Sequence, residues 1–73
     1  MMKAKVNLDT GSEIKRFVEI CSRIDMPILL VDGENFCVSA KSLLGAVATM
    51  DWSEVYVTCE KDIRAYILDF LAD

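Results

Sequence analysis

The chain has no histidine, and among its 73 residues there are only three glycines and one proline. Without an imidazole it lacks the one side chain whose unperturbed pKa gives acid–base chemistry near neutral pH. Three widely spaced glycines do not form a phosphate-binding loop. The carboxylates of Asp9, Glu13, Asp32 and Glu34 fall at turn or cap positions, which such residues commonly fill. We therefore expect no independent enzyme and no cofactor.

Cysteine is scarce and its spacing is wide. Cys21, Cys37 and Cys59 are odd in number, and no CxxC pair or histidine is available to complete a zinc site. Each falls at a position expected to face inward on its element, where a free thiol packs as a small apolar group. We expect three buried, reduced thiols and no metal site.

Long apolar runs and basic blocks are also missing. The longest apolar runs, residues 26–31 and Leu43–Ala48 with its Gly45, fall far short of the roughly 20 residues of a membrane span. The opening MMKAK lacks the apolar segment of a signal peptide. Twelve acidic and eight basic residues give a net charge of −4, which does not favour binding to nucleic acid. We expect a cytoplasmic protein that contacts neither membrane nor nucleic acid.

Apolar residues are abundant instead, at 53% of a chain that is long enough for one domain over residues 1–73. A core of this size supplies only about 3–5 kcal/mol of net stability. The high apolar content therefore predicts either a full core or an uncovered apolar patch that binds a partner.

The apolar pattern alternates between periods typical of strands and of helices. Strand patterns lie at residues 3–8, 28–31, 36–38 and 54–59, with hairpin-turn chemistry at 32–35. Helical spacing occurs at residues 14–24, 43–49 and 61–71. The resulting order, β-α-β-β-α-β-α, predicts a two-layer α+β sandwich.

Two details of this pattern carry further expectations. Thr10 followed by Glu13 predicts a capping box at the first helix, with Ser12 as a competing cap. Residues 28–31 are apolar at every position, so we expect the second face of this strand to be covered as well, either by something outside the sheet or by a sheet edge or a loop.

Residues 36–47 contain the change from strand to helix pattern, and Ser39, Lys41 and Ser42 lie at the changeover. From the residues alone, a serine here is a helix cap. The stretch SAKSLLG at 39–45 also resembles the regulatory-serine segment of HPr, the histidine-containing phosphocarrier family of the bacterial sugar phosphotransferase system. The order of elements is similar over nearly the whole chain. The resemblance implies an open-faced sandwich, a four-stranded antiparallel sheet with helices on one face, and makes Ser42 the candidate regulatory phosphorylation site.

The active loop of that family precedes the first helix and carries a His-x-Arg-Pro motif. Aligned on residues 17–18, this chain has Thr10 at the histidine position, then Gly11, with Ser12 at the arginine and Glu13 at the proline. Threonine has no nitrogen nucleophile that titrates near neutral pH, and Glu13 would repel an incoming phosphoryl group. The resemblance thus implies an HPr-like protein without phosphocarrier activity.

Two roles remain open for such a protein. The first is regulatory: by resemblance, phosphorylation at Ser42 controls binding to a carbon-control regulator or to components of the sugar phosphotransferase system. The second is a pure protein-interaction module. Its candidate docking residues are apolar and closely spaced, and the same side chains could instead close the small core: Leu43, Leu44, Val47, Met50 and Trp52.

A third interpretation is a small ligand-sensing module, because ferredoxin-like regulatory domains share the order β-α-β-β-α-β. The short second helix and the additional C-terminal helix argue against it. A homodimer through an exposed strand edge is compatible with each interpretation.

Overall fold

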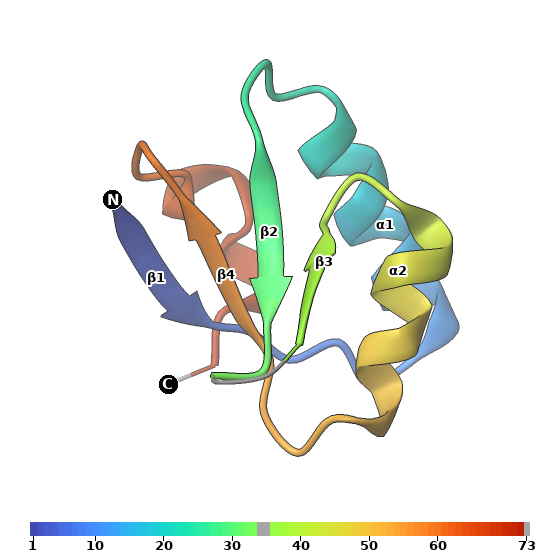
Figure 1. Ribbon diagram of the computed structural model, residues 1–73. Helices are drawn as coiled ribbons and strands as arrows, with labels where there is room; N and C mark the ends of the chain where they lie inside the picture. Colours follow the sequence, from blue (N-terminus) through green and yellow to red (C-terminus); the bar gives the residue numbers. More distant parts are fainter. Residues whose placement is uncertain (34–35, 73) are drawn as a thin grey trace.

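The computed structural model describes residues 1–33 and 36–72 and has an α+β fold (Figure 1). Its four-stranded antiparallel sheet has the order β1-β4-β2-β3. The strands are β1 (Met2–Lys5), β2 (Ile28–Val31), β3 (Cys37–Ser39) and β4 (Tyr56–Cys59), and the helices are α1 (Gly11–Ser22) and α2 (Leu43–Ala48). No helix in the described part of the chain is long and apolar enough to cross a membrane.

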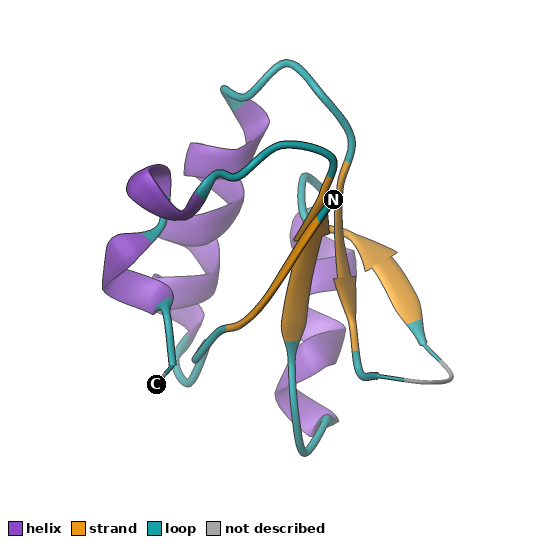
Figure 2. Ribbon diagram, turned by 90° about the vertical axis from the view of Figure 1, so that its left-hand side faces the viewer, coloured by secondary structure: helices purple, strands orange, loops and turns teal. Residues whose placement is uncertain are grey.

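One face of the sheet carries the core. Leu30 of β2 and Val57 of β4 are directly paired and fully buried, whereas Leu29, on the opposite face, is 39% exposed. Helix α1 lies on the buried side, and α2 packs against α1 and β3. Figure 2 shows the strands in a second view, with helical segments beside and behind them. The predicted second cover over β2 is not provided by residues 1–33 or 36–72.

Helix α1 begins at the predicted capping box. The Thr10 hydroxyl accepts a hydrogen bond from the Glu13 backbone N–H at 3.2 Å, and the Glu13 carboxylate accepts one from the Thr10 N–H at 3.1 Å. The competing prediction, Ser12 as the cap, is wrong because Ser12 already lies within the first turn. From this start, the helical spacing turns Ile14 and Phe17 into the core.

The C-terminal segment is not the predicted α-helix over residues 61–71. It forms two short 3-10 turns, η2 (Arg64–Tyr66) and η3 (Leu68–Phe70). The Asn7 N–H donates to the Phe70 carbonyl at 2.7 Å, and the Ala72 N–H donates to the Lys5 carbonyl at 2.9 Å. Because these bonds tie the backbone to the end of β1, the segment does not continue as a helix. This removes one of the two arguments against a ferredoxin-like module.

Most of the apolar stripe predicted for this segment is nevertheless buried, but Tyr66, which the spacing also placed in the stripe, is 64% exposed. Ile63, Ile67 and Phe70 all lie in the core. The rings of Phe70 and Phe17 meet edge to face, with centroids 5.3 Å apart and an interplanar angle of 82°. The C-terminal turns and α1 therefore share one core on the same side of the sheet.

The thiols divide differently from the prediction. Cys21 and Cys59 are buried, as expected, but Cys37 is exposed. Cys37 pairs directly with Val31 in the β2–β3 hairpin, so the two side chains share the outer face of the sheet. At the hairpin turn, Gly33 has a φ of 116°, which favours glycine. The other half of the predicted turn, residues 34–35, lies outside the described residues.

Candidate functional site

Ser42 is the N-cap of α2. Its hydroxyl oxygen accepts a hydrogen bond from the Gly45 backbone N–H at 3.2 Å, and the residue is exposed. The preceding Ser39 accepts the Lys41 N–H at 3.1 Å, which shapes the turn that leads into the helix. The capping role predicted for Ser42 is therefore confirmed, and its hydroxyl is accessible from solvent.

Lys41 places this helix start against the end of α1. Its ammonium donates to the Ile24 carbonyl at 2.6 Å. From there α2 runs back along α1, so the two helices point in opposite directions (Figure 1). Ser42 therefore lies at one end of the helix pair and the loop at residues 10–13 at the other. The structure does not bring these two candidate regions together.

The N-terminus of α1 is already occupied by a carboxylate of the chain itself. Glu13 accepts hydrogen bonds from the backbone N–H groups of Asp9 and Thr10, both at 3.1 Å. These donors would otherwise be available to an anion. Arg16, in the second turn of α1, pairs with Asp69 at 3.3 Å and lies over the Phe70 ring. The loop thus offers an incoming phosphoryl group neither free donors at Asp9 and Thr10 nor an unpaired arginine.

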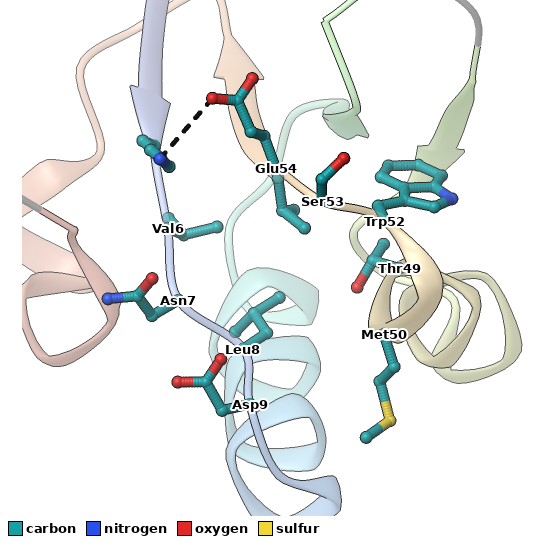
Figure 3. Close-up of a pocket in the computed structure, with 11 residues that line it drawn as sticks. Val6, Asn7, Leu8, Asp9, Thr49, Met50, Trp52, Ser53 and Glu54 are labelled. Atoms are coloured by element: carbon teal, nitrogen blue, oxygen red, sulfur yellow. Dashed lines mark ion pairs between the residues drawn. The ribbon is translucent and has the colours of Figure 1, made fainter.

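A small cavity of about 150 Å³ lies between residues 5–9, which precede this loop, and residues 49–55, which follow α2 (Figure 3). Asp9 and Met50 both line it, although they lie far apart in the sequence. Lys5 and Glu54 form an ion pair of 3.7 Å at its wall. The volume is below the roughly 300–1,000 Å³ typical of small-molecule pockets. This cavity could not be predicted from the sequence, because it depends on how the segment after β1 and the η1 turn (Thr49–Asp51) are placed relative to each other.

The side of α2 that faces the fold is built from small residues. Ala46 and Thr49 are buried, and the Thr49 hydroxyl donates to the Ala46 carbonyl at 2.7 Å. A Cβ atom added at Gly45 would lie 3.2 Å from the Val38 Cβ of β3. Because α2 approaches β3 this closely, its inner side has no room for large side chains.

The large apolar side chains of α2 and of the turn that follows it point outward. We call this set the α2 apolar surface, and its members have the following exposed fractions: Leu43 48%, Leu44 87%, Val47 45% and Met50 49%. The sequence left two alternatives for them, core closure or an interface. The exposures place these four outside the core, while Trp52 is half-buried and packs against the core.

An aromatic pair extends this surface toward the β2–β3 hairpin. Phe36 is exposed and stacks on Trp52, with ring centroids 5.9 Å apart and an interplanar angle of 23°. Sequence reasoning placed Phe36 in a strand and missed this contact. The only available signal was a large aromatic residue directly after turn residues, which does not identify its partner.

Across residues 1–33 and 36–72, no group of three cysteine, aspartate or glutamate side chains is placed to hold a metal ion. Burial, with a smaller contribution from Cys59, raises the pKa of the Cys21 thiol to about 12, so it carries little thiolate at neutral pH. Comparison with protein-family models, with curated proteins and with solved structures found no match to the chain.

Proposed function

We propose that this chain is an HPr-like protein without phosphocarrier activity, and that it acts by binding a protein partner through the α2 apolar surface. One observation carries the proposal: four large apolar side chains of one short segment are 45–87% exposed, while the smaller Ala46 and Thr49 of the same segment are buried. A helix at a protein surface normally turns its large apolar residues inward. The reversed arrangement is typical of a docking surface.

The composition of the surface supports a protein as the partner. Its aliphatic residues are followed along the chain by the exposed Met50 and by Trp52, on which the exposed ring of Phe36 stacks. Methionine and aromatic side chains are enriched in protein–protein interfaces and adapt to a partner's shape. By resemblance, we expect the partner to be a carbon-control regulator. The alternative partner is a component of the sugar phosphotransferase system.

Phosphorylation of Ser42 is the proposed control. Its exposed hydroxyl directly precedes Leu43 in the chain. A phosphoryl group adds a charge of about −1.5 to −2 at neutral pH. The start of α2 stabilises such a charge by about 0.3–1 kcal/mol. Modification would thus place an anion at the edge of an apolar surface without refolding the domain.

The docking test is a titration of the ¹⁵N-labelled protein with a purified HPr-binding carbon-control regulator, and in parallel with the first enzyme of the sugar phosphotransferase system. We expect amide shifts centred on α2 and at least tenfold weaker binding for Leu44→Asp. The matched control is Leu68→Asp, because Leu68 is 66% exposed and lies in η3. Equal affinities for the two variants, or no binding to either protein, would refute docking through α2.

The control by Ser42 is tested separately. Incubation with an HPr-type serine kinase and ATP should add one phosphoryl group, which Ser42→Ala should abolish. The modified protein should bind the partner with an affinity at least several-fold different from the unmodified one. Absence of labelling, or equal affinities, removes the regulatory part and leaves the docking proposal intact.

A further inference from the structure

A second cavity lies at the other end of α1 from the capping loop, and no residue of the α2 apolar surface lines it. Its volume is about 420 Å³, within the roughly 300–1,000 Å³ range of small-molecule sites. The end of α1 forms one wall and the segment after β4 forms the other. The residues that matter most for its chemistry are Arg23, Asp25, Met26, Lys61, Ile63 and Tyr66.

Some of the charged side chains around this cavity form ion pairs or hydrogen bonds within the described part of the chain, and others do not. Asp62, which also lines it, accepts hydrogen bonds from the Arg64 guanidinium at 2.9 Å and from the Arg64 backbone N–H at 3.0 Å. The side chains of Arg23 and Lys61 have no ion pair or hydrogen bond with any residue that the structure describes. Because Asp62 is paired with Arg64, Asp25 is the one lining carboxylate left to balance Arg23 and Lys61. The lining therefore has a surplus of one positive charge.

The helix end beside the cavity does not cancel this surplus. The C-terminus of a helix carries a partial negative charge on its unpaired carbonyl groups, which would repel an anion. Here the Ile20 and Cys21 carbonyls accept the backbone N–H groups of Arg23 and Ile24, both at 3.1 Å. The Lys41 ammonium, which donates to the Ile24 carbonyl at 2.6 Å, adds a positive charge just beyond the end of α1. Arg23 and Lys61 are therefore left to bind a negatively charged group.

The rest of the lining is apolar and aromatic. Ile63 is buried and Met26 is half-buried, so the two provide apolar walls. The Tyr66 ring is exposed at the margin, where it is available for stacking. A cavity that pairs two cations with these surfaces matches a ligand with one anionic end and one apolar end.

We propose that this cavity binds a small organic anion that carries an aromatic or aliphatic group, such as an aryl carboxylate. The anionic end lies against Arg23 and Lys61, and the apolar end packs on Met26, Ile63 and the Tyr66 ring. This site is independent of the proposed docking function, because it shares no residue with the α2 apolar surface.

The test uses two probes with the same phenyl group and opposite charge, 3-phenylpropionate and phenethylamine. We expect 3-phenylpropionate to give saturable amide shifts at residues 23–26 and 61–66, with phenethylamine at least tenfold weaker. Lys61→Glu should weaken 3-phenylpropionate at least tenfold, and Lys61→Met, which keeps an apolar stem, should weaken it several-fold. Lys15→Glu, the same charge change on the exposed side of α1, should have little effect.

Three results would overturn this inference. The first is the absence of saturable shifts with 3-phenylpropionate, and the second is equal binding of phenethylamine. The third is equal weakening by Lys15→Glu and Lys61→Glu, which would indicate a response to net charge rather than to the cavity. None of these results bears on partner docking through α2.

Discussion

The Lys41 ammonium donates to the Ile24 carbonyl at 2.6 Å. This bond joins the turn that precedes α2 to the segment that follows α1. This contact spans two segments that are 17 positions apart in the sequence. It holds the residue before Ser42 against the end of α1 that is opposite the capping loop. Lys41 is therefore a structural residue in the turn that leads into α2, in addition to being Ser42's neighbour in sequence.

Removal of the Lys41 ammonium should destabilise the fold. We expect Lys41→Met to lower the free energy of unfolding by about 1–3 kcal/mol, because a partly buried carbonyl loses its charged donor. Urea unfolding followed by circular dichroism measures this change. The matched control is Lys15→Met on the exposed side of α1, for which we expect a change within about 0.5 kcal/mol. Equal midpoints for the two variants would show that the bond contributes nothing.

The capping box at α1 gives a second pair of variants. Thr10→Ala should lower the free energy of unfolding by about 1 kcal/mol, because the Glu13 N–H loses its acceptor. Ser12→Ala should change it little, since the Ser12 side chain does not cap the helix. Urea midpoints of the two variants, measured side by side, check the assignment. A larger loss for Ser12→Ala would reverse it.

The start of α1 was predictable because its signals are local. Thr10 and Glu13 are three positions apart, and both capping hydrogen bonds form within one helical turn. The C-terminal segment shows the limit of such reasoning. The spacing of Ile63, Ile67 and Phe70 correctly predicted burial, but not the backbone conformation. The latter depends on hydrogen bonds to β1, more than 60 positions away in the sequence.

The outward orientation of α2 was undecidable from its own sequence for a related reason. Leu43 and Val47 have a helical spacing that suits a core or an interface equally well. The choice follows from the short distance between Gly45 and Val38, which admits only small residues on the inner side. Likewise, the exposure of Cys37 follows from its pairing with Val31, and pairing register is a property of two strands together.

The three thiols should differ sharply in reactivity. Cys37 is exposed, whereas Cys21 and Cys59 are buried. At pH 8 in the native state, we expect 5,5′-dithiobis(2-nitrobenzoic acid) to modify Cys37 rapidly and the other two only after unfolding. The number of reactive thiols is measured from the absorbance of the 2-nitro-5-thiobenzoate that the reagent releases, with and without urea. The Cys37→Ala variant should lack the rapid phase. Rapid modification of Cys37→Ala in the absence of urea would contradict the burial of Cys21 and Cys59.

Stability should fall in alkaline solution because of Cys21. Burial, together with the nearby Cys59, raises the pKa of its thiol from 9.0 to about 12 in the folded chain. Between these values the unfolded chain has released the proton and the folded chain still holds it. Unfolding thus becomes easier as pH rises, with a slope of up to about 1.4 kcal/mol per pH unit. Below pH 9 this contribution is complete.

A comparison of variants isolates this term from the other groups that titrate at high pH. Urea unfolding of the parent chain and of Cys21→Ala should be measured at pH 8, 9, 10 and 11, with Cys37→Ala as the matched control for an exposed thiol. Cys21→Ala leaves a gap in the core, so it should be the less stable protein at pH 8. The parent should lose this advantage as the pH rises above 9, because only the parent carries the buried thiol. A difference between parent and Cys21→Ala that stays constant from pH 8 to pH 11 would show that burial does not hold the proton on Cys21.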